Sequence, residues 1–226
     1  MAKDGLVLVF DMDQTIIDSD PFFKSNPLEY SKIPDYLNMN VVNILLRAAK
    51  LRPTKVMAIF LLTNNSDKQF VAAVDSALYK LSMGSRGKYN TVESADSNSS
   101  KMPHKEYFFD DIFMIDHPKR KQASIGVSSG VKDLHTVLEM MHTINSDEHP
   151  NIIKNLFFFD DMSNHKLHDE FIEYSGGKYK NHYITIHPPY QKGKIDKTNY
   201  RPILKALQKL DKKPASLSLR KTRRNH

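Results

Sequence analysis

The chain has 226 residues, of which 40% are hydrophobic and 26% are charged, and its formal net charge at pH 7 is +7. This length and composition are typical of one globular domain with a sizeable core. The chain contains no cysteine, which excludes a disulfide framework, a zinc-thiolate site and a cysteine nucleophile.

The positive charge is concentrated at the C-terminal end. Residues 191–226 hold 12 Lys/Arg and 2 Asp/Glu, a net +10, which leaves −3 for the rest because −3 + 10 = +7. We expect a folded domain over residues 1–210 and a basic, flexible tail over residues 211–226, with the basicity belonging to this end rather than to the fold. The tail could bind nucleic acid or acidic protein segments, be read as a nuclear address, or serve only as a solvated charged end.

The first residues, Met-Ala-Lys-Asp-Gly, do not form the apolar stretch of a signal peptide. No run in the sequence approaches the ~20 apolar residues that span a bilayer. We therefore expect an intracellular protein without a membrane partner, and the basic end fits a nuclear location.

Apolar segments and amphipathic segments alternate along the chain. The apolar segments predict strands over residues 6–10, 56–62, 112–115, 156–159 and 183–186. The amphipathic segments predict helices over residues 41–51, 68–81, 132–141 and 203–210. The expected fold class is α/β: a Rossmann-like, doubly wound parallel sheet with helices on both faces. Residues 93–101 are polar and small and predict a mobile surface loop.

Polar residues follow three of the predicted strands. Asp11 and Asp13 follow the first strand, Thr63 follows the second, and Asp160 and Asp161 follow the fourth. Because the carboxyl ends of parallel strands lie at one edge of a sheet, we expect these side chains to meet there. Crowded carboxylates share protons or recruit cations, and Mg²⁺ prefers oxygen ligands of this kind.

A phosphoryl group at such a site would add negative charge, so a cationic side chain is expected besides the metal. Lys132 is the best candidate because it begins a predicted helix, whose N-terminus also favours anions. Lys119, Arg120 and Lys121 are alternatives in a polar loop. With Mg²⁺ bound, one carboxylate can attack phosphorus while another carries a proton to and from oxygen.

The order of these residues resembles a known family. An apolar strand runs into Asp11-x-Asp13-x-Thr15, and Thr63, Lys132 and Asp160-Asp161 follow in that order. This pattern resembles the haloacid dehalogenase (HAD) superfamily of phosphohydrolases over roughly residues 6–186. The resemblance implies an enzyme, a phosphoric monoester hydrolase.

The resemblance also implies a division of roles. Asp11 would be the nucleophile that forms an aspartyl-phosphate, and Asp13 the acid that protonates the leaving group and then the base that activates water. Thr63 would hydrogen-bond the phosphoryl oxygens, and Lys132 would neutralise their charge. The implied Mg²⁺ ligands are Asp11, the carbonyl group of Asp13, Asp161 and, in support, Asp160.

Members of this superfamily differ in the cap domains that cover their sites. Residues 16–41 and 66–130 provide about 25 and about 65 residues, too few for a cap of ordinary domain size beside the helix and strand they contain. We expect an open site, which suits phosphorylated protein side chains. The segment "VKDLHTVL" before "LFFFDD" is similar to the capless branch that includes RNA polymerase C-terminal-domain phosphatases. Gln14 departs from that branch, which more often has Glu, and the loop 122–130 has no counterpart in it.

The same residues also have structural interpretations. Asp11 and Asp13 could close a turn, Thr63, Asn65 or Ser66 could cap a helix, and Asp160-Asp161 could cap a helix that begins near residue 163. Asn164 could act as an outer-shell group at the metal. His165 and His168 have helical spacing, but no third ligand is evident, so we expect exposed histidines rather than a zinc pair.

Two other functions fit the sequence. The same chemistry could act on the terminal phosphate of a nucleic acid recruited by the basic tail. Alternatively, the chain could be a catalytically silent HAD-like scaffold that binds partners through its tail and surface loops.

Overall fold

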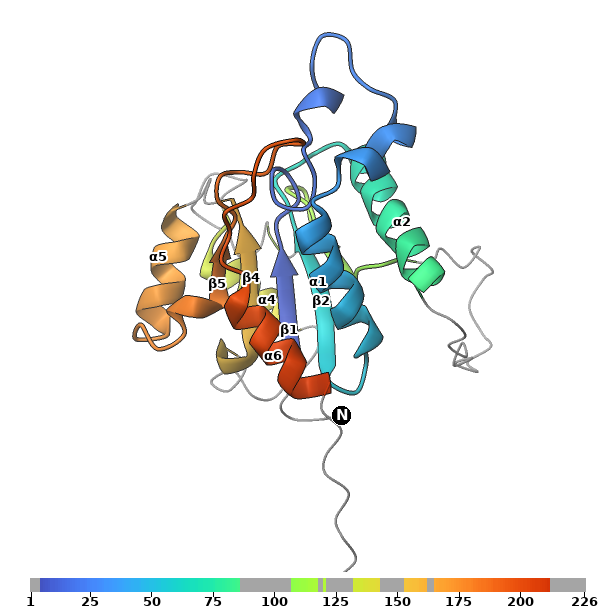
Figure 1. The fold of residues 1–226 in the computed structure, drawn as a ribbon. Coiled ribbons are helices and arrows are strands. Elements are labelled where there is room, and N and C mark those ends of the chain that lie inside the picture. The colour runs from blue at the N-terminus through green and yellow to red at the C-terminus, as the bar shows by residue number, and fades with distance from the viewer. Residues whose placement is uncertain are drawn as a thin grey trace, which may run out of the picture.

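The computed structural model describes residues 5–85, 107–117, 120, 132–142, 153–161 and 165–211 (Figure 1). These residues form one sheet of five strands in the order β3-β2-β1-β4-β5, and every neighbouring pair is parallel. The strands are β1 (Leu6–Phe10), β2 (Val56–Leu62), β3 (Asp111–Phe113), β4 (Leu156–Asp160) and β5 (Tyr183–Thr185). The predicted edge strand 112–115 thus begins one residue earlier and ends two residues earlier, because β3 pairs only with Phe60, Leu61 and Leu62 of β2.

Helices cover both faces of this sheet. The α-helices among the described residues are α1 (Met39–Lys50), α2 (Lys68–Ser85), α4 (Leu134–His142), α5 (His165–Tyr174) and α6 (Arg201–Asp211). The 3₁₀ helices of the described residues lie in the connections between these elements: η1 (Asp20–Phe22), η2 (Tyr30–Tyr36), η3 (Ile153–Asn155) and η4 (Lys180–His182). α6 includes Asp211, so the folded part extends one residue beyond the predicted boundary at 210.

Successive side chains of β1 point to opposite faces of the sheet and belong to two separate layers of the core. Leu6, Leu8 and Phe10 pack on the side covered by α1, α2 and α6, whereas Val7 and Val9 pack on the side covered by α4 and α5. All five residues of β1 are buried, as a central strand covered on both faces requires. The predicted α/β class, with a parallel sheet between helices, is confirmed and is consistent with a Rossmann-like fold.

The strand order reverses beside β1. The chain adds β2 and β3 on one side of β1 and then crosses to add β4 and β5 on the other. In open parallel sheets, ligands bind beyond the carboxyl ends of the strands where this order reverses. Here that position lies between the ends of β1 and β4.

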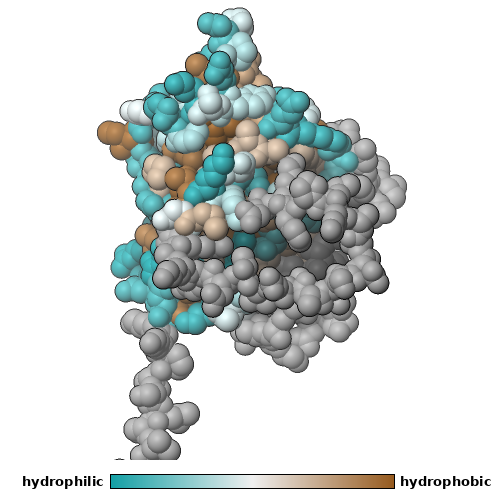
Figure 2. Space-filling view, turned by 90° about the vertical axis from the view of Figure 1, so that its right-hand side faces the viewer, coloured by the Kyte–Doolittle hydropathy of each residue, from teal (hydrophilic) through white to brown (hydrophobic). Residues whose placement is uncertain are grey.

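A flap of residues 14–37 leaves the end of β1 and projects above the sheet (Figure 1). Gln14 has a φ of 51°, in the left-handed region, and its side-chain Nε2 donates to Ser19 Oγ and to Asp20 Oδ1. Phe22 anchors the flap, since its ring lies 5.2 Å from that of Phe70 in α2. Figure 2 shows the face of the molecule that lies on the right in Figure 1. The flap is at the top, and apolar and polar side chains are mixed beneath it.

A strap of residues 186–200 follows β5 and holds the flap from the other side. The backbone N–H of Tyr190 donates to the carbonyl of Gln14, and its hydroxyl donates to the carbonyl of Leu37. The backbone N–H of Lys192 donates to Asp18 Oδ2 over 2.9 Å. Segments that are about 170 residues apart in sequence therefore meet at the base of the flap.

Some expectations concern residues outside the described part of the chain: the loops 93–101 and 122–130, and the tail after residue 211.

Among the helices that the structure describes, none combines the length and the apolar character needed to cross a membrane.

Candidate functional site

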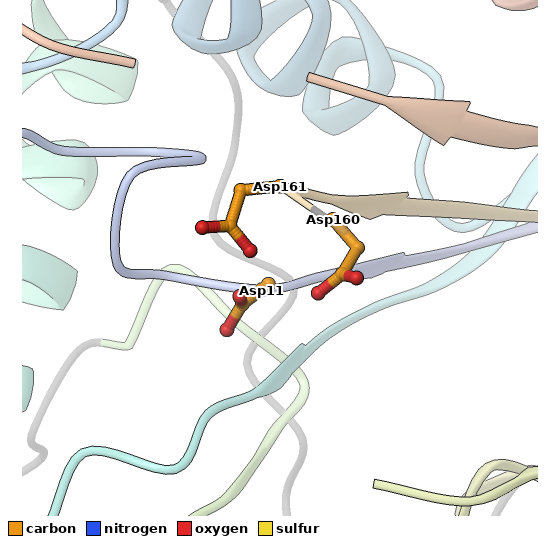
Figure 3. A group of neighbouring side chains, drawn as sticks. All are labelled: Asp11, Asp160 and Asp161. Atoms are coloured by element: carbon orange, nitrogen blue, oxygen red, sulfur yellow. The ribbon is translucent and has the colours of Figure 1, made fainter. Parts of the chain in front are cut away.

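Three carboxylates meet at the carboxyl ends of β1 and β4. Asp11 directly follows β1, Asp160 is the last residue of β4, and Asp161 follows it (Figure 3). One oxygen from each lies within 4.8 Å of the others, so the three could hold a metal ion. Strand pairing explains the meeting, because Phe10 lies opposite Phe159 and the N–H of Asp11 donates to the Phe159 carbonyl. We call these three residues the acidic rim.

Lys132 reaches this rim from the segment just before α4 (Leu134–His142). Its Nζ lies 2.5 Å from Asp11 Oδ1 and 3.3 Å from Asp160 Oδ1, and its side chain is 2% exposed. The predicted helix start at Lys132 is wrong by two residues, because α4 begins at Leu134. Asp133 accepts a hydrogen bond from the N–H of Thr136, as a helix cap does, so Lys132 precedes the cap and turns into the site.

Burial and neighbouring charges shift the pKa values of Asp11 and Lys132 at the rim. Burial raises the pKa of Asp11, and the nearby carboxylates of Asp160 and Asp13 add to this while Lys132 opposes it. Burial favours the neutral form of Lys132, but Asp11 and Asp160 outweigh it and raise the pKa of the ammonium group. Within the described part of the chain, Lys132 Nζ lies close to Asp11 and Asp160, and carboxylates gathered in this way also attract a divalent cation.

Asp160 orients its neighbours. It is fully buried, and its Oδ1 faces Lys132 while its Oδ2 accepts a hydrogen bond of 2.9 Å from the Tyr183 hydroxyl. Burial raises the pKa of Tyr183, with Asp160 adding to the shift, so the phenol stays a donor. The sequence reasoning missed Tyr183, although a hydroxyl in an otherwise apolar strand beside β4 is a signal that could have found it.

Asp13 lies apart from the three clustered carboxylates. Its carboxylate is 3.4 Å from Thr63 Oγ1 and 3.2 Å from the side-chain amide nitrogen of Asn65. The cap of α2 is not Asn65 but Asp67, which accepts from the N–H groups of Gln69 and Phe70. Asn65 instead donates to Asp13, a contact that the sequence reasoning did not anticipate.

Thr63 is fully buried at the end of β2. Its Oγ1 accepts a hydrogen bond from the N–H of Asn65, and its carbonyl accepts one from Arg120. Arg120 also donates to the side chain of Asn64 over 2.6 Å. Of the three alternative cations, Lys119 and Lys121 lie outside the described residues, and Arg120 secures the backbone after β2.

The histidine pair lies in α5. His168 Nδ1 is 3.1 Å from Asp169 Oδ1, and its ring meets that of Tyr183 edge-on. Asp11, Asp160 and Asp161 form the one metal-compatible group found among the described residues, and His168 is not part of it. The side chains of Asn164 and His165 lie outside the described part.

Comparison with known proteins adds no assignment: no protein-family model matches the chain, and no curated protein or solved structure is significantly similar to it.

Proposed function

We propose that the protein is a Mg²⁺-dependent phosphomonoester hydrolase of HAD type, without a large cap, that acts through an aspartyl-phosphate. The observation that carries the proposal is the pairing of Asp11 with a buried lysine at the acidic rim. Asp13 stands separately beside Thr63 and Asn65. A nucleophile, a neutralising cation and a second carboxylate for proton transfer thus occupy three distinct positions.

The residues at the rim fit a hard divalent cation. Asp11 and Asp161 would hold it together with the carbonyl group of Asp13, with Asp160 in support. All of these donors are oxygens, the ligand type that Mg²⁺ prefers. When bound, the ion would neutralise negative charge on the phosphoryl oxygens and on the carboxylates.

Asp11 would act as the nucleophile. One of its oxygens forms a bond to phosphorus while the bond from phosphorus to the ester oxygen breaks. Lys132, whose Nζ is 2.5 Å from Asp11 Oδ1, holds this carboxylate in place and offsets the phosphoryl charge. Asp160 and Tyr183 fix Lys132 in turn.

Asp13 would move the proton. In its acid form it protonates the departing ester oxygen, which leaves as an alcohol. As a carboxylate it then takes a proton from the water that attacks phosphorus. The phosphorus–Asp11 bond breaks, so inorganic phosphate leaves and both aspartates return to their starting forms. Thr63 and Asn65 hold the Asp13 carboxylate for both steps.

Phosphorylated protein side chains are the proposed substrates. Among the described residues, the flap stands beyond the carboxyl ends of the strands (Figure 1). Phe22 anchors it against α2, and the flap is far smaller than a cap domain. A site covered in this way can admit a side chain that projects from a macromolecule.

The test is release of phosphate from p-nitrophenyl phosphate with Mg²⁺ and with a chelator, for the unmodified protein and for Asp11→Asn. We expect activity that needs the metal and falls by about 10³-fold or more in the variant. The matched control is Asp35→Asn, an exposed carboxylate of η2, which should leave the rate unchanged. Equal rates in the unmodified protein and Asp11→Asn would overturn the mechanism.

Substrate class is tested by comparing a phosphoserine peptide with an oligonucleotide that carries a 5′-phosphate. Faster hydrolysis of the peptide supports the proposal, and faster hydrolysis of the oligonucleotide favours a nucleic-acid terminal phosphatase. No hydrolysis of any substrate, together with no Mg²⁺ binding by calorimetry, would indicate a silent scaffold.

A further inference from the structure

A pocket lies at the opposite end of the sheet from the acidic rim. It has a volume of about 680 Å³ and lies between α6, η3, η4 and the start of β1. Leu6 of β1 lines it, and Asp11 is five residues further along the same extended strand, so roughly 16 Å separate the two positions. A group bound in the pocket therefore could not also occupy the acidic rim.

The wall formed by α6 is positively charged. Arg201, Lys205 and Lys209 recur every four residues, so they lie on one side of the helix, and all three are exposed. Within the described part of the chain, no ion pair involves any of these three side chains. Lys154 of η3 adds a fourth cation to the lining. No aspartate or glutamate lies among the described residues that line the pocket.

The interior of the pocket is partly apolar. Leu6, Pro202, Ala206 and Leu210 line it beside the charged wall. His182 stacks on Phe157 with ring centroids 4.1 Å apart and an interplanar angle of 18°. Burial lowers the pKa of His182, so the imidazole is neutral at pH 7 and the charge comes from the lysines and arginine.

We propose that this basic pocket docks an acidic or phosphorylated segment of a polypeptide. The three exposed cations of α6, with no carboxylate among the described lining residues, favour an anionic partner, and the apolar part can take an aliphatic side chain of the same segment. A single-stranded nucleic acid is less suitable, because the Phe157 ring is 2% exposed and His182 already covers it, which leaves no open stacking surface there.

Docking here goes beyond the proposed hydrolysis and does not require it. If the rim is catalytic, a protein with several phosphorylated residues could be held at the pocket while another phosphate enters the rim. Holding it in this way would raise the effective concentration of the second phosphate.

The experiment measures binding of a fluorescein-labelled peptide that carries two phosphoserines and a leucine to the full chain by fluorescence anisotropy. A chelator is present throughout, so turnover does not affect the result. We expect Lys205→Glu and Lys209→Glu each to weaken binding about 5-fold, because each change replaces an attraction with a repulsion. The residues after Asp211 are the same in every variant, so their contribution cancels.

The matched control is Lys80→Glu, which makes the same charge change on the exposed side of α2, beyond α1 from the pocket. We expect this variant to bind like the unmodified protein. Equal weakening by Lys80→Glu and Lys205→Glu would show that peptide binding depends on net charge alone, and it would overturn the docking site. Tighter binding of an oligothymidine probe, itself lost in Lys205→Glu, would overturn the polypeptide assignment in favour of nucleic acid.

Discussion

Asp160 has both of its carboxylate oxygens engaged by neighbouring side chains, Lys132 at one and Tyr183 at the other. It is fully buried, so its charge is stabilised by these two partners rather than by water. Asp161, at the same strand end, is more exposed. The two adjacent aspartates thus suit different tasks, Asp160 as a support for Lys132 and Asp161 as a metal ligand.

The Tyr183 hydroxyl is expected to act as a positioning group for this support. Tyr183→Phe leaves a buried carboxylate oxygen without its donor, which should lower the free energy of unfolding by about 1–3 kcal/mol. Because Asp160 then holds Lys132 and the rim less firmly, the Mg²⁺ concentration for half-maximal activity should rise about 3-fold or more. Thermal unfolding and Mg²⁺ titrations of the hydrolysis rate measure the two effects.

The control for Tyr183→Phe is Tyr179→Phe, which removes a hydroxyl that has no hydrogen bond within the described part of the chain. It should leave both the stability and the Mg²⁺ dependence unchanged. An unaltered Mg²⁺ dependence in Tyr183→Phe, alongside reduced stability, would limit Tyr183 to a structural role.

Asn65 is expected to orient Asp13 for proton transfer. Asn65→Ala removes the amide that donates to Asp13 Oδ1 over 3.2 Å, so the carboxyl group should be less often aimed at the ester oxygen. We expect kcat to fall about 10-fold with KM little changed, and the fall to be larger for an alkyl phosphate, whose leaving group needs the proton more. Steady-state kinetics with alkyl and aryl phosphates measure this difference.

Ser66→Ala is the control for Asn65, because this neighbouring serine is exposed. If Asn65→Ala slows alkyl and aryl phosphates equally, its contact with Asp13 does not serve proton transfer to the leaving group.

At the scale of elements, the predicted strands that end at the site are close to those observed. β1 and β2 have the predicted bounds, and β4 extends by Asp160 alone, because buried parallel strands are continuous apolar runs that end where polar residues begin. The sequence thus predicted which strand ends meet, and so brought Asp11 together with Asp160 and Asp161.

The contacts that organise the site were not predictable in this way. Tyr183 meets Asp160 because β5 pairs with β4, and Asn65 meets Asp13 across 52 residues of sequence. The local sequence around each residue does not identify its partner, so only the folded arrangement reveals the contact. The strap is similar: nothing local in residues 186–200 indicates that Tyr190 will bond to the backbone of the flap.

The strap is expected to make stability depend on pH through Asp196. Burial would raise the pKa of Asp196, but hydrogen bonds from Thr198, Asn40 and Tyr200 outweigh it and hold the pKa below its usual value. A lowered pKa in the folded state stabilises the fold above the unfolded-state pKa of about 3.9, and this contribution is lost as pH falls below it.

Replacing Asp196 by asparagine should remove this contribution. Asp196→Asn is expected to be less stable than the unmodified protein at pH 6 by less than about 1 kcal/mol, because the site is partly exposed. The difference should shrink as pH falls to about 3. Urea unfolding at a series of pH values measures it, with Asp35→Asn as the control. A stability difference between the two proteins that stays constant with pH would contradict a lowered pKa of Asp196 in the folded state.

At the scale of the whole molecule, the two ends of the sheet carry opposite charge. Carboxylates gather at the carboxyl end of β1, and the basic pocket lies at its amino end. The sequence assigned the positive charge to the C-terminal end rather than to the fold, but Arg201, Lys205 and Lys209 belong to α6. This helix is packed into the domain through buried Ile203 and Leu207. A charge count along the chain could not show which face of the helix these residues occupy.

One aromatic pair joins the core to the acidic rim. Phe10 and Phe159 stack with centroids 4.2 Å apart, each is fully buried, and each directly precedes a rim aspartate. Phe159→Ala should lower the free energy of unfolding by about 3–5 kcal/mol because it leaves a cavity between β1 and β4. Urea denaturation measures this loss, and Mg²⁺ calorimetry under conditions where the variant is still folded should show weaker binding, since the cavity loosens the strand ends that carry Asp11 and Asp160.

Phe23→Ala provides the comparison, because Phe23 is 50% exposed on the flap and contacts the Phe70 ring from outside the core. Phe23→Ala should lower the free energy of unfolding by less than about 1.5 kcal/mol, and Mg²⁺ binding should be unchanged. If Phe159→Ala destabilises the protein as expected but binds Mg²⁺ normally, the rim is held by backbone pairing of β1 with β4 rather than by the packing beneath it. That result would separate the stability of this fold from the geometry of its site.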